Sequence, residues 1–295
     1  MEFSDLRTGQ FLMNRHLLLY LPVVVLLLAT VSCKNRKPAP VVIKTLPEVI
    51  HPNEKAAQDA LTLELTEFVK DGCFSEASLG YIILDYTKGL PKLVAEHNSK
   101  QGLIPASTQK ILTTGAALEI FGPPIYHEVT ITNLNSINWR ANRLLQKIGE
   151  KKYNHYDFLH GSQAVMEYWR AKGVDMKGMY ICDGSGKSRD NTLTVKLLTD
   201  ILFKMTSSPV FPVFYNSLPI AGLTGTMHKW LKGSDGEGRV HAKTGSLAGV
   251  RSYTGYVRTV NGKKLIFAFI VNNYSCRTTV FKKKMERVMI RMAEL

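Results

Sequence analysis

The segment LIPASTQKILTTGAALE, residues 103–119, has the pattern of a helix that begins with a serine and carries a lysine three residues later. Residues three apart share a helix face, so the Ser107 hydroxyl and the Lys110 amine can meet. A serine is a poor nucleophile unless a base takes its proton, and a lysine can be that base when its pKa is lowered. Alone, this pattern is more often a solvated helix start. With supporting motifs it predicts an activated serine at a helix N-terminus, where backbone N–H groups face developing negative charge.

A second polar segment, Lys243-Thr244-Gly245-Ser246, follows a strand-like run at 239–243. A lysine and two hydroxyls at a strand edge can hold a substrate carboxylate, and Gly245 would let a ligand backbone approach closely. The same residues also suit an ordinary exit from a strand into a turn. This segment therefore predicts a substrate-binding edge only together with other motifs.

A third segment, Ser136-Ile137-Asn138, lies just before a predicted helix. The serine hydroxyl could pass a proton to a leaving amine, and the asparagine amide could bind a substrate carbonyl. Simple helix capping by Ser136 or Asn138 is an equally ordinary interpretation. Of the three motifs, this one is the least specific by itself.

The three motifs together are much more specific than any one of them. S-x-x-K, a serine–asparagine motif and K-T-G form the signature of class A β-lactamases and penicillin-binding proteins. Here they begin, in that order, at Ser107, Ser136 and Lys243. The flanking sequence resembles the D-alanyl-D-alanine carboxypeptidase/endopeptidase family, the class C low-molecular-mass penicillin-binding proteins of penicillin-binding protein 4 type. The resemblance covers about residues 55–295, and its strongest segments are 103–119, 136–149, 183–191, 217–226 and 242–249.

The resemblance implies a role for each catalytic side chain. Ser107 would attack the carbonyl of a terminal D-Ala-D-Ala, or of a D-Ala cross-link, and become acylated, with Lys110 as its base. Ser136 and Lys243 would relay a proton to the leaving amine, and Asn138 would hold the substrate amide. Water would then hydrolyse the acyl-enzyme.

The same resemblance implies the binding groups and partners. Thr244 and Ser246 would bind the leaving-group carboxylate, and the backbone N–H groups of Ser107 and Ser246 would form the oxyanion hole. The expected partners are peptidoglycan stem peptides, with β-lactam antibiotics as covalent inhibitors, and no cofactor is implied. We expect the glycine-rich segment 183–191 to be structural or to support the site indirectly.

The sequence departs from this family in two places. Members usually carry large extra domains between the S-x-x-K helix and the S-x-N segment, but here only the 25 residues Ile111 to Asn135 separate them. We expect Gly122 to Asn135 to be a bare connection, which leaves a single catalytic domain over 51–295 without the extra domains. Ile137 also replaces the polar middle residue that is common in S-x-N, and so loses any hydrogen bond of that side chain.

The first fifty residues have the pattern of an export signal and a tether. Arg15 and His16 precede an apolar run from Leu17 to Thr30, and Cys33 follows small residues, which resembles a bacterial lipobox. We interpret 1–33 as a signal peptide with lipidation at Cys33, and 34–50, which is rich in proline, as a tether. An uncleaved N-terminal anchor is the alternative. Both interpretations predict a membrane-anchored protein of the cell envelope, on the periplasmic side.

Composition narrows the function classes further. The chain has 295 residues, of which 45% are hydrophobic and 21% charged, as in ordinary globular proteins. The net charge of +14 favours anionic surfaces or polymers. Basic residues are scattered without the aromatic interleaving of a nucleic-acid module, so we expect no nucleic-acid partner.

Cysteines lack metal-ligand spacing, which predicts no structural zinc. Three cysteines outside the signal, Cys73, Cys182 and Cys276, permit one disulfide without specifying the pair.

The hydrophobic patterning predicts an α/β fold, an antiparallel sheet flanked by helices with a helical subdomain, as in serine β-lactamases and penicillin-binding proteins. The strand-like runs are 81–84, 90–96, 239–243, 252–260 and 264–271, and the first and last of them are expected to pair. The predicted helices are 54–70, 107–121, 138–148, 163–172, 194–205 and 280–292.

Two other function classes stay open at this point. A β-lactamase or serine esterase could use the same scaffold, although fast deacylation usually needs a placed carboxylate, and the sequence assigns none. A degenerate domain could instead bind cell wall without turnover. The intact Ser107, Lys110, Asn138 and Lys243 favour an enzyme.

Overall fold

The structure is a computed structural model that describes residues 52–295. The predicted signal peptide 1–33, its Cys33 and the tether 34–50 lie outside the described residues. The described residues 52–295 belong to one compact unit. Within the described part of the chain, no helix is both long and apolar enough to cross a membrane.

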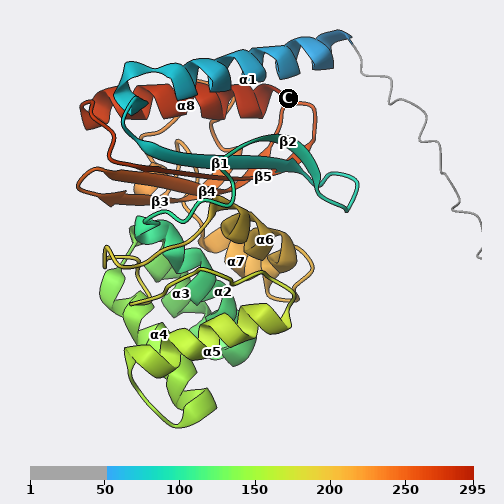
Figure 1. Cartoon of the computed structure of the whole chain (residues 1–295). Helices are drawn as coiled ribbons and strands as arrows, with labels where there is room; N and C mark the ends of the chain where they lie inside the picture. The colour runs from blue at the N-terminus through green and yellow to red at the C-terminus, as the bar shows by residue number, and fades with distance from the viewer. Residues whose placement is uncertain (1–51) are drawn as a thin grey trace, which may run out of the picture. The chain divides into compact units, whose positions relative to one another are not determined.

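A five-stranded antiparallel sheet forms the centre of this unit (Figure 1). Its order is β2-β1-β5-β4-β3, so the first strand of the described residues pairs with the last, as predicted. The pairing runs from Ser78 opposite Asn272 to Asp85 opposite Leu265. The strands are β1 (Ser78–Asp85), β2 (Lys92–His97), β3 (Val240–Leu247), β4 (Val250–Arg258) and β5 (Lys264–Asn272).

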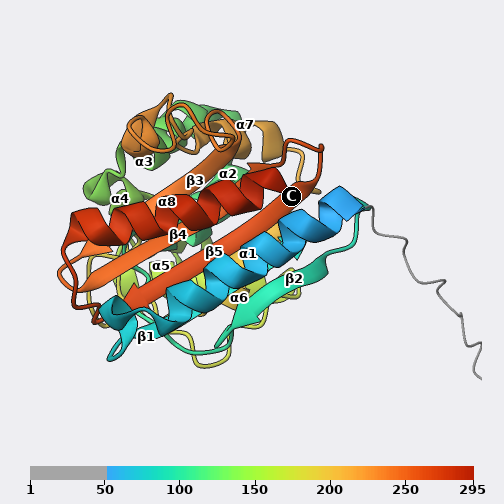
Figure 2. The same cartoon turned by 90° about the horizontal axis from the view of Figure 1, so that it is seen from above.

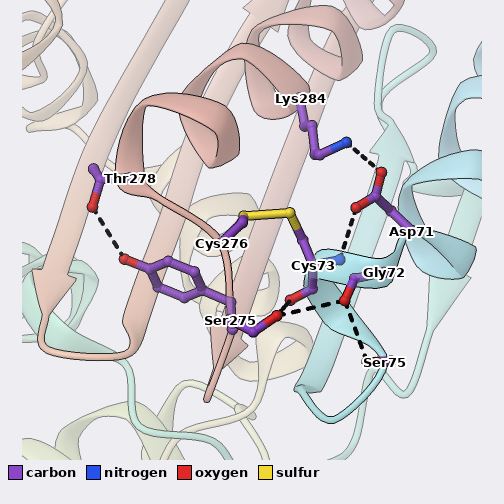
Figure 3. Close-up of a disulfide and its surroundings, with 9 residues drawn as sticks. Asp71, Gly72, Cys73, Ser75, Ser275, Cys276, Thr278 and Lys284 are labelled. Carbon is purple, nitrogen blue, oxygen red and sulfur yellow. Dashed lines mark hydrogen bonds and ion pairs between the residues drawn. A yellow bond between two sulfur atoms is a disulfide. The ribbon is translucent and has the colours of Figure 1, made fainter.

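Two helices from opposite ends of the described chain lie side by side on one face of the sheet (Figure 2). They are α1 (Pro52–Lys70) and α8 (Thr278–Glu294). Their apolar stripes meet the sheet, where the Phe68 ring packs edge-on against Phe269 of β5 and Phe281 of α8. A disulfide between Cys73 and Cys276 joins the chain just after α1 to the chain just before α8 (Figure 3). Cys182 is a free thiol.

The other face of the sheet carries the helical subdomain (Figure 1). One helix, α6 (Val195–Met205), packs on strands β1 and β5, and the Thr194 hydroxyl caps its start by accepting the Leu197 N–H. Below it lies a cluster of helices with a common apolar core, in which the buried Trp169 donates its indole N–H to the Leu112 carbonyl at 3.0 Å. These helices are α2 (Lys110–Phe121), α3 (Tyr126–Asn135), α4 (Asn138–Tyr153), α5 (Phe158–Ala171) and α7 (Phe211–Ser217).

Several element boundaries differ from the sequence predictions. The expected bare connection 122–135 is wrong, because a short 3-10 turn and α3 occupy it, with Val129 buried in the core. Gly149 does not end α4; it lies inside the helix, where a side chain would collide with the backbone of Gly161 in α5. Helix α5 begins five residues earlier than predicted because the Asp157 carboxylate accepts the His160 N–H and caps it.

Candidate active site

The serine and lysine of the first motif meet at the start of α2. Ser107 lies in a 3-10 turn, Ala106–Gln109, and Lys110 is the first residue of the α-helix that continues it. The distance from Lys110 Nζ to Ser107 Oγ is 2.9 Å. The residue before the serine, Ala106, is buried and has a φ of +47°, which a side-chain-bearing residue seldom adopts. The turn that presents Ser107 is therefore held in a strained conformation by its surroundings.

Burial of Lys110 favours its neutral form, which can act as a base. Its side chain is fully buried, and it contacts two oxygen acceptors besides Ser107: Asn138 Oδ1 and the Ser185 carbonyl, each at 2.8 Å. Burial lowers the pKa of Lys110 to about 7, against the opposite effect of the Asp183 carboxylate. A neutral amine has two N–H donors and one lone pair. With Asn138 and Ser185 as acceptors, the lone pair is left to accept the Ser107 hydroxyl proton.

The second lysine and second serine also meet. Lys243 on β3 donates a hydrogen bond to Ser136 Oγ at 2.9 Å and another to the Thr244 carbonyl at 2.9 Å. Ser136 has a φ of +57°, and its backbone N–H binds the Thr132 carbonyl at the end of α3. Its side chain does not cap α4, so the capping interpretation is wrong for Ser136. Burial and the nearby Lys110 charge lower the pKa of Lys243 well below its usual value.

The end of β3 presents its backbone at the open edge of the sheet. Ala242 N donates outward to the Pro219 carbonyl at 2.9 Å, which covers the first half of this edge. Because strand residues alternate with a period of two, the N–H groups of Thr244 and Ser246 face the same outward direction. Among residues 52–295, no backbone group pairs with them there. These two N–H groups are therefore free to bind the carbonyl groups of an extended peptide.

Gly245 is needed for the chain's own packing. A Cβ at this position would lie 2.1 Å from Ser252 Oγ and 3.0 Å from both the Pro105 carbonyl and the Ser107 backbone nitrogen. The missing side chain therefore lets β3 lie directly beside the nucleophile turn. Gly245 was predicted to allow the close approach of a ligand, and the structure adds a close contact within the protein.

Two residues near the site had been given no role from the sequence. The Arg251 guanidinium on β4 donates to Ser246 Oγ, and the Thr226 hydroxyl lies 2.8 Å from Thr244 Oγ1. A two-residue loop, Ala248-Gly249, joins β3 to β4 and sets Arg251 opposite Ser246. Recognising that hairpin from the sequence would have placed an arginine beside the predicted carboxylate-binding hydroxyls.

Segment 183–191 supports the site from behind, as expected. The Asp183 carboxylate accepts hydrogen bonds from the backbone N–H groups of Ser185, Gly186 and Ser188 at 2.6–2.7 Å. Burial raises the pKa of Asp183, but these N–H groups more than offset it, so the pKa lies below its ordinary value. The folded loop holds the Ser185 carbonyl against Lys110.

This arrangement of two serines, two buried lysines and one asparagine at a helix start beside a sheet edge defines a class: the serine β-lactamases and penicillin-binding proteins. The TLA-1 extended-spectrum β-lactamase has the same fold, with a TM-score of 0.62 and 18% identity over 81% of this chain and 98% of that one. Penicillin binding protein 4 from Haemophilus influenzae has a TM-score of 0.52 and 23% identity over 69% of this chain and 41% of that one.

Within this class, the chain belongs to the D-Ala-D-Ala carboxypeptidase 3 (S13) family, whose sequence profile matches residues 61–133 and 123–295. It is 34% identical over 145 residues to a D-alanyl-D-alanine carboxypeptidase of Actinomadura sp. (strain R39). That alignment covers 48% of this chain and 27% of the relative. The chain thus spans less than half the length of the curated relatives it matches.

Proposed function

We propose that this protein is a serine-type D-Ala-D-Ala carboxypeptidase/endopeptidase that works through an acyl-enzyme. The observation that carries the proposal is the 2.9 Å contact between Ser107 Oγ and a buried Lys110 whose pKa is lowered to about 7. At neutral pH a large share of this lysine is neutral and can act as a base, which an ordinary lysine cannot do.

Acylation would begin when Lys110 takes the Ser107 hydroxyl proton and Oγ attacks the carbonyl carbon of the substrate. The carbonyl oxygen becomes negative and would be held by the backbone N–H groups of Ser107 and Ser246. The C–N bond then breaks, and the leaving amine needs a proton. The Ser136 hydroxyl, hydrogen-bonded to Lys243, would deliver it, and the relay would be refilled from protonated Lys110.

The leaving D-Ala carries a negatively charged carboxylate, and hydroxyl groups and a positively charged side chain lie at the end of β3. Thr244 and Ser246 supply hydroxyls, and Arg251 supplies a guanidinium that contacts Ser246. Arginine binds carboxylates through paired N–H donors. A peptidoglycan stem peptide would fit this edge, and a β-lactam, which also carries a carboxylate beside a reactive amide, would acylate Ser107 in its place.

Peptidase function is favoured over β-lactamase function by the surroundings of Asp183. Among the described residues, Asp183 is the carboxylate whose charge acts on Lys110, and backbone N–H groups occupy its oxygens. A carboxylate bound in this way is a poor base for activating a deacylating water. We therefore expect a penicillin acyl-enzyme to persist, as in a penicillin-binding protein.

We further propose that the protein is exported and anchored at the periplasmic side of the membrane through a lipid on Cys33. The support is the apolar run 17–30 followed by small residues and cysteine. Expression in a bacterial host with radiolabelled palmitate tests this directly. Label on the full chain that Cys33→Ser abolishes supports the anchor, and equal label on both forms contradicts it.

The activity is tested by measuring free D-alanine released from a peptide that ends in D-Ala-D-Ala. The full chain is expected to release one D-alanine per peptide, and Ser107→Ala, with an unchanged circular dichroism spectrum, is expected to release none. Release by both forms, or by neither, would contradict the proposal.

A further inference from the structure

A pocket of about 380 Å³ lies beside α5, outside the site described above. Its size lies within the range of small-molecule sites in proteins. One wall is the stripe of α5 that contains Phe158, Ser162 and Met166, spaced four residues apart on one helix face. The opposite wall is the segment 180–182, which ends in Cys182. None of the residues proposed to catalyse the reaction lines this pocket.

A buried hydroxyl in this pocket has no partner. Ser162 is only 6% exposed, and its Oγ makes no hydrogen bond with any described residue. A buried polar group without a partner costs free energy, and natural proteins seldom retain one without a use for it. Ser162 lies midway along the stripe that lines the pocket, so a change of its side-chain rotamer would turn this buried hydroxyl toward a bound ligand.

The charges at the rim favour an anionic ligand. Arg170, one turn beyond Met166, is an exposed residue that lines the pocket, and no carboxylate in residues 52–295 forms an ion pair with its guanidinium. Glu167 also lines the pocket, but it is occupied by an ion pair with Lys152 and a hydrogen bond from the Tyr153 hydroxyl at 2.6 Å. Among the residues that line the pocket, Arg170 therefore carries a positive charge without an ion-pair partner, at the rim of walls that are mainly apolar and aromatic.

The far wall of the pocket connects directly to the candidate active site. The Cys182 N–H donates to Asn191 Oδ1 at 2.7 Å, and the same oxygen accepts the Gln109 side-chain N–H at 3.0 Å. Gln109 lies between the nucleophile and its base in sequence. Three residues beyond Cys182, the Ser185 carbonyl accepts a hydrogen bond from Lys110. A shift of the Cys182 backbone would therefore move two contacts of the nucleophile turn.

We propose that this pocket is a second binding site, for a small carboxylate with an apolar body, and that its occupancy changes the reactivity of Ser107. The carboxylate would pair with Arg170, the apolar body would lie against Phe158 and Met166, and an acceptor atom would reach Ser162. Binding of the ligand to this pocket does not depend on the proposed acylation of Ser107. The coupling claim, in contrast, rests on that acylation.

Binding is tested on the full chain by the alkylation rate of Cys182, with 3-phenylpropionate as the probe ligand. Iodoacetamide labelling, followed peptide by peptide in a mass spectrometer, separates Cys182 from Cys33. A bound ligand is expected to shield the thiol, slowing labelling about tenfold at ten times its dissociation constant. An unchanged rate at every concentration of 3-phenylpropionate would overturn the site.

Three variants test which residues the ligand contacts. Arg170→Leu is expected to abolish the shielding, while Arg277→Leu, which removes the same charge at the start of α8 on the other side of the sheet, is expected to keep it. Ser162→Ala is expected to weaken binding without lowering the melting temperature, because its hydroxyl has no partner to lose. Shielding that survives Arg170→Leu would contradict the assignment of a carboxylate site.

Coupling is tested by the acylation rate with a fluorescent penicillin. Saturating 3-phenylpropionate is expected to change this rate in the wild type and in Arg277→Leu, but not in Arg170→Leu. An unchanged rate in a protein whose Cys182 is shielded would overturn the coupling and leave the binding site. Failure of all acylation would refute the proposed function, and the Cys182 result would still decide the binding site.

Discussion

The Lys243 amine on β3 donates a hydrogen bond to the Ser136 hydroxyl at 2.9 Å, although the two residues are 107 positions apart in the sequence. This contact joins the sheet to the helical subdomain at the point where a leaving amine would need a proton. We predict that Ser136→Ala lowers the acylation rate about 10²- to 10⁴-fold, the usual range for a lost proton-transfer group. Stopped-flow measurement with a fluorescent penicillin checks this.

The exposed Ser207 supplies the matched control. Ser207→Ala is expected to acylate at the wild-type rate. A Ser136→Ala protein that folds normally and acylates within about threefold of wild type would remove Ser136 from the relay, since that effect is far below the usual range.

The pKa of Lys110 predicts a specific pH dependence. The base form is the neutral amine, so protonation below a pKa of about 7 removes it. The acylation rate is therefore expected to rise about tenfold for each pH unit below that pKa and to level off above it. A profile of rate against pH from 5.5 to 9 at constant ionic strength measures this. A rate that is flat between pH 6 and 8 would show that Lys110 is not the base.

The close approach of β3 to the nucleophile predicts the effect of a single methyl group. In Gly245→Ala, the new Cβ would lie far inside contact distance of Ser252 Oγ and would press on the Ser107 amide. We expect a loss of about 1–3 kcal/mol in the free energy of unfolding, together with slower acylation. Urea denaturation measures the first. Gly72→Ala is the control, because nothing lies within 4 Å of its Cβ position, and equal stability of the two variants would contradict the packing account.

The disulfide is expected to stabilise the fold without affecting the site. Cys73 and Cys276 close a loop with a sequence separation of 203 residues, on the face of the sheet opposite the Ser107 turn. Replacing both by serine is expected to reduce the free energy of unfolding by about 2–5 kcal/mol and leave the acylation rate unchanged. Chemical denaturation of the double variant checks this against Cys182→Ser, which removes a free thiol. A loss of acylation in the folded double variant would mean that the α1–α8 layer positions the site.

Contacts between residues that are neighbours along one helix could be predicted from the sequence. Contacts that depend on how distant segments or paired strands align could not. Ser107 and Lys110 are one helical turn apart, so their contact follows from spacing alone. The contact of Ser136 with Lys243 joins distant segments and was expected only through resemblance to a family. The role of Arg251 depends on the register of a hairpin, and three cysteines gave no basis for choosing the pair.

Helix α3 shows why intrinsic helix propensity fails to predict some helices. Its sequence, YHEVTITNLN, is rich in β-branched residues and asparagine, which favour a helix weakly. Packing supplies what propensity does not, because Val129, Thr132 and Asn133 are buried and Asn133 donates a hydrogen bond to Ser217 of α7. Partners such as Ser217 lie far from α3 in the sequence, so the residues of α3 alone do not reveal them.

Covalent labelling of the full chain with a fluorescent penicillin, beside Ser107→Ala, tests the central claim most directly. We predict one label per chain, located on Ser107 by peptide mass spectrometry, absent from the variant and persisting long after excess penicillin is removed. Rapid loss of the label would indicate a β-lactamase. No label on folded wild-type protein, or a label that survives Ser107→Ala, would contradict Ser107 as the nucleophile.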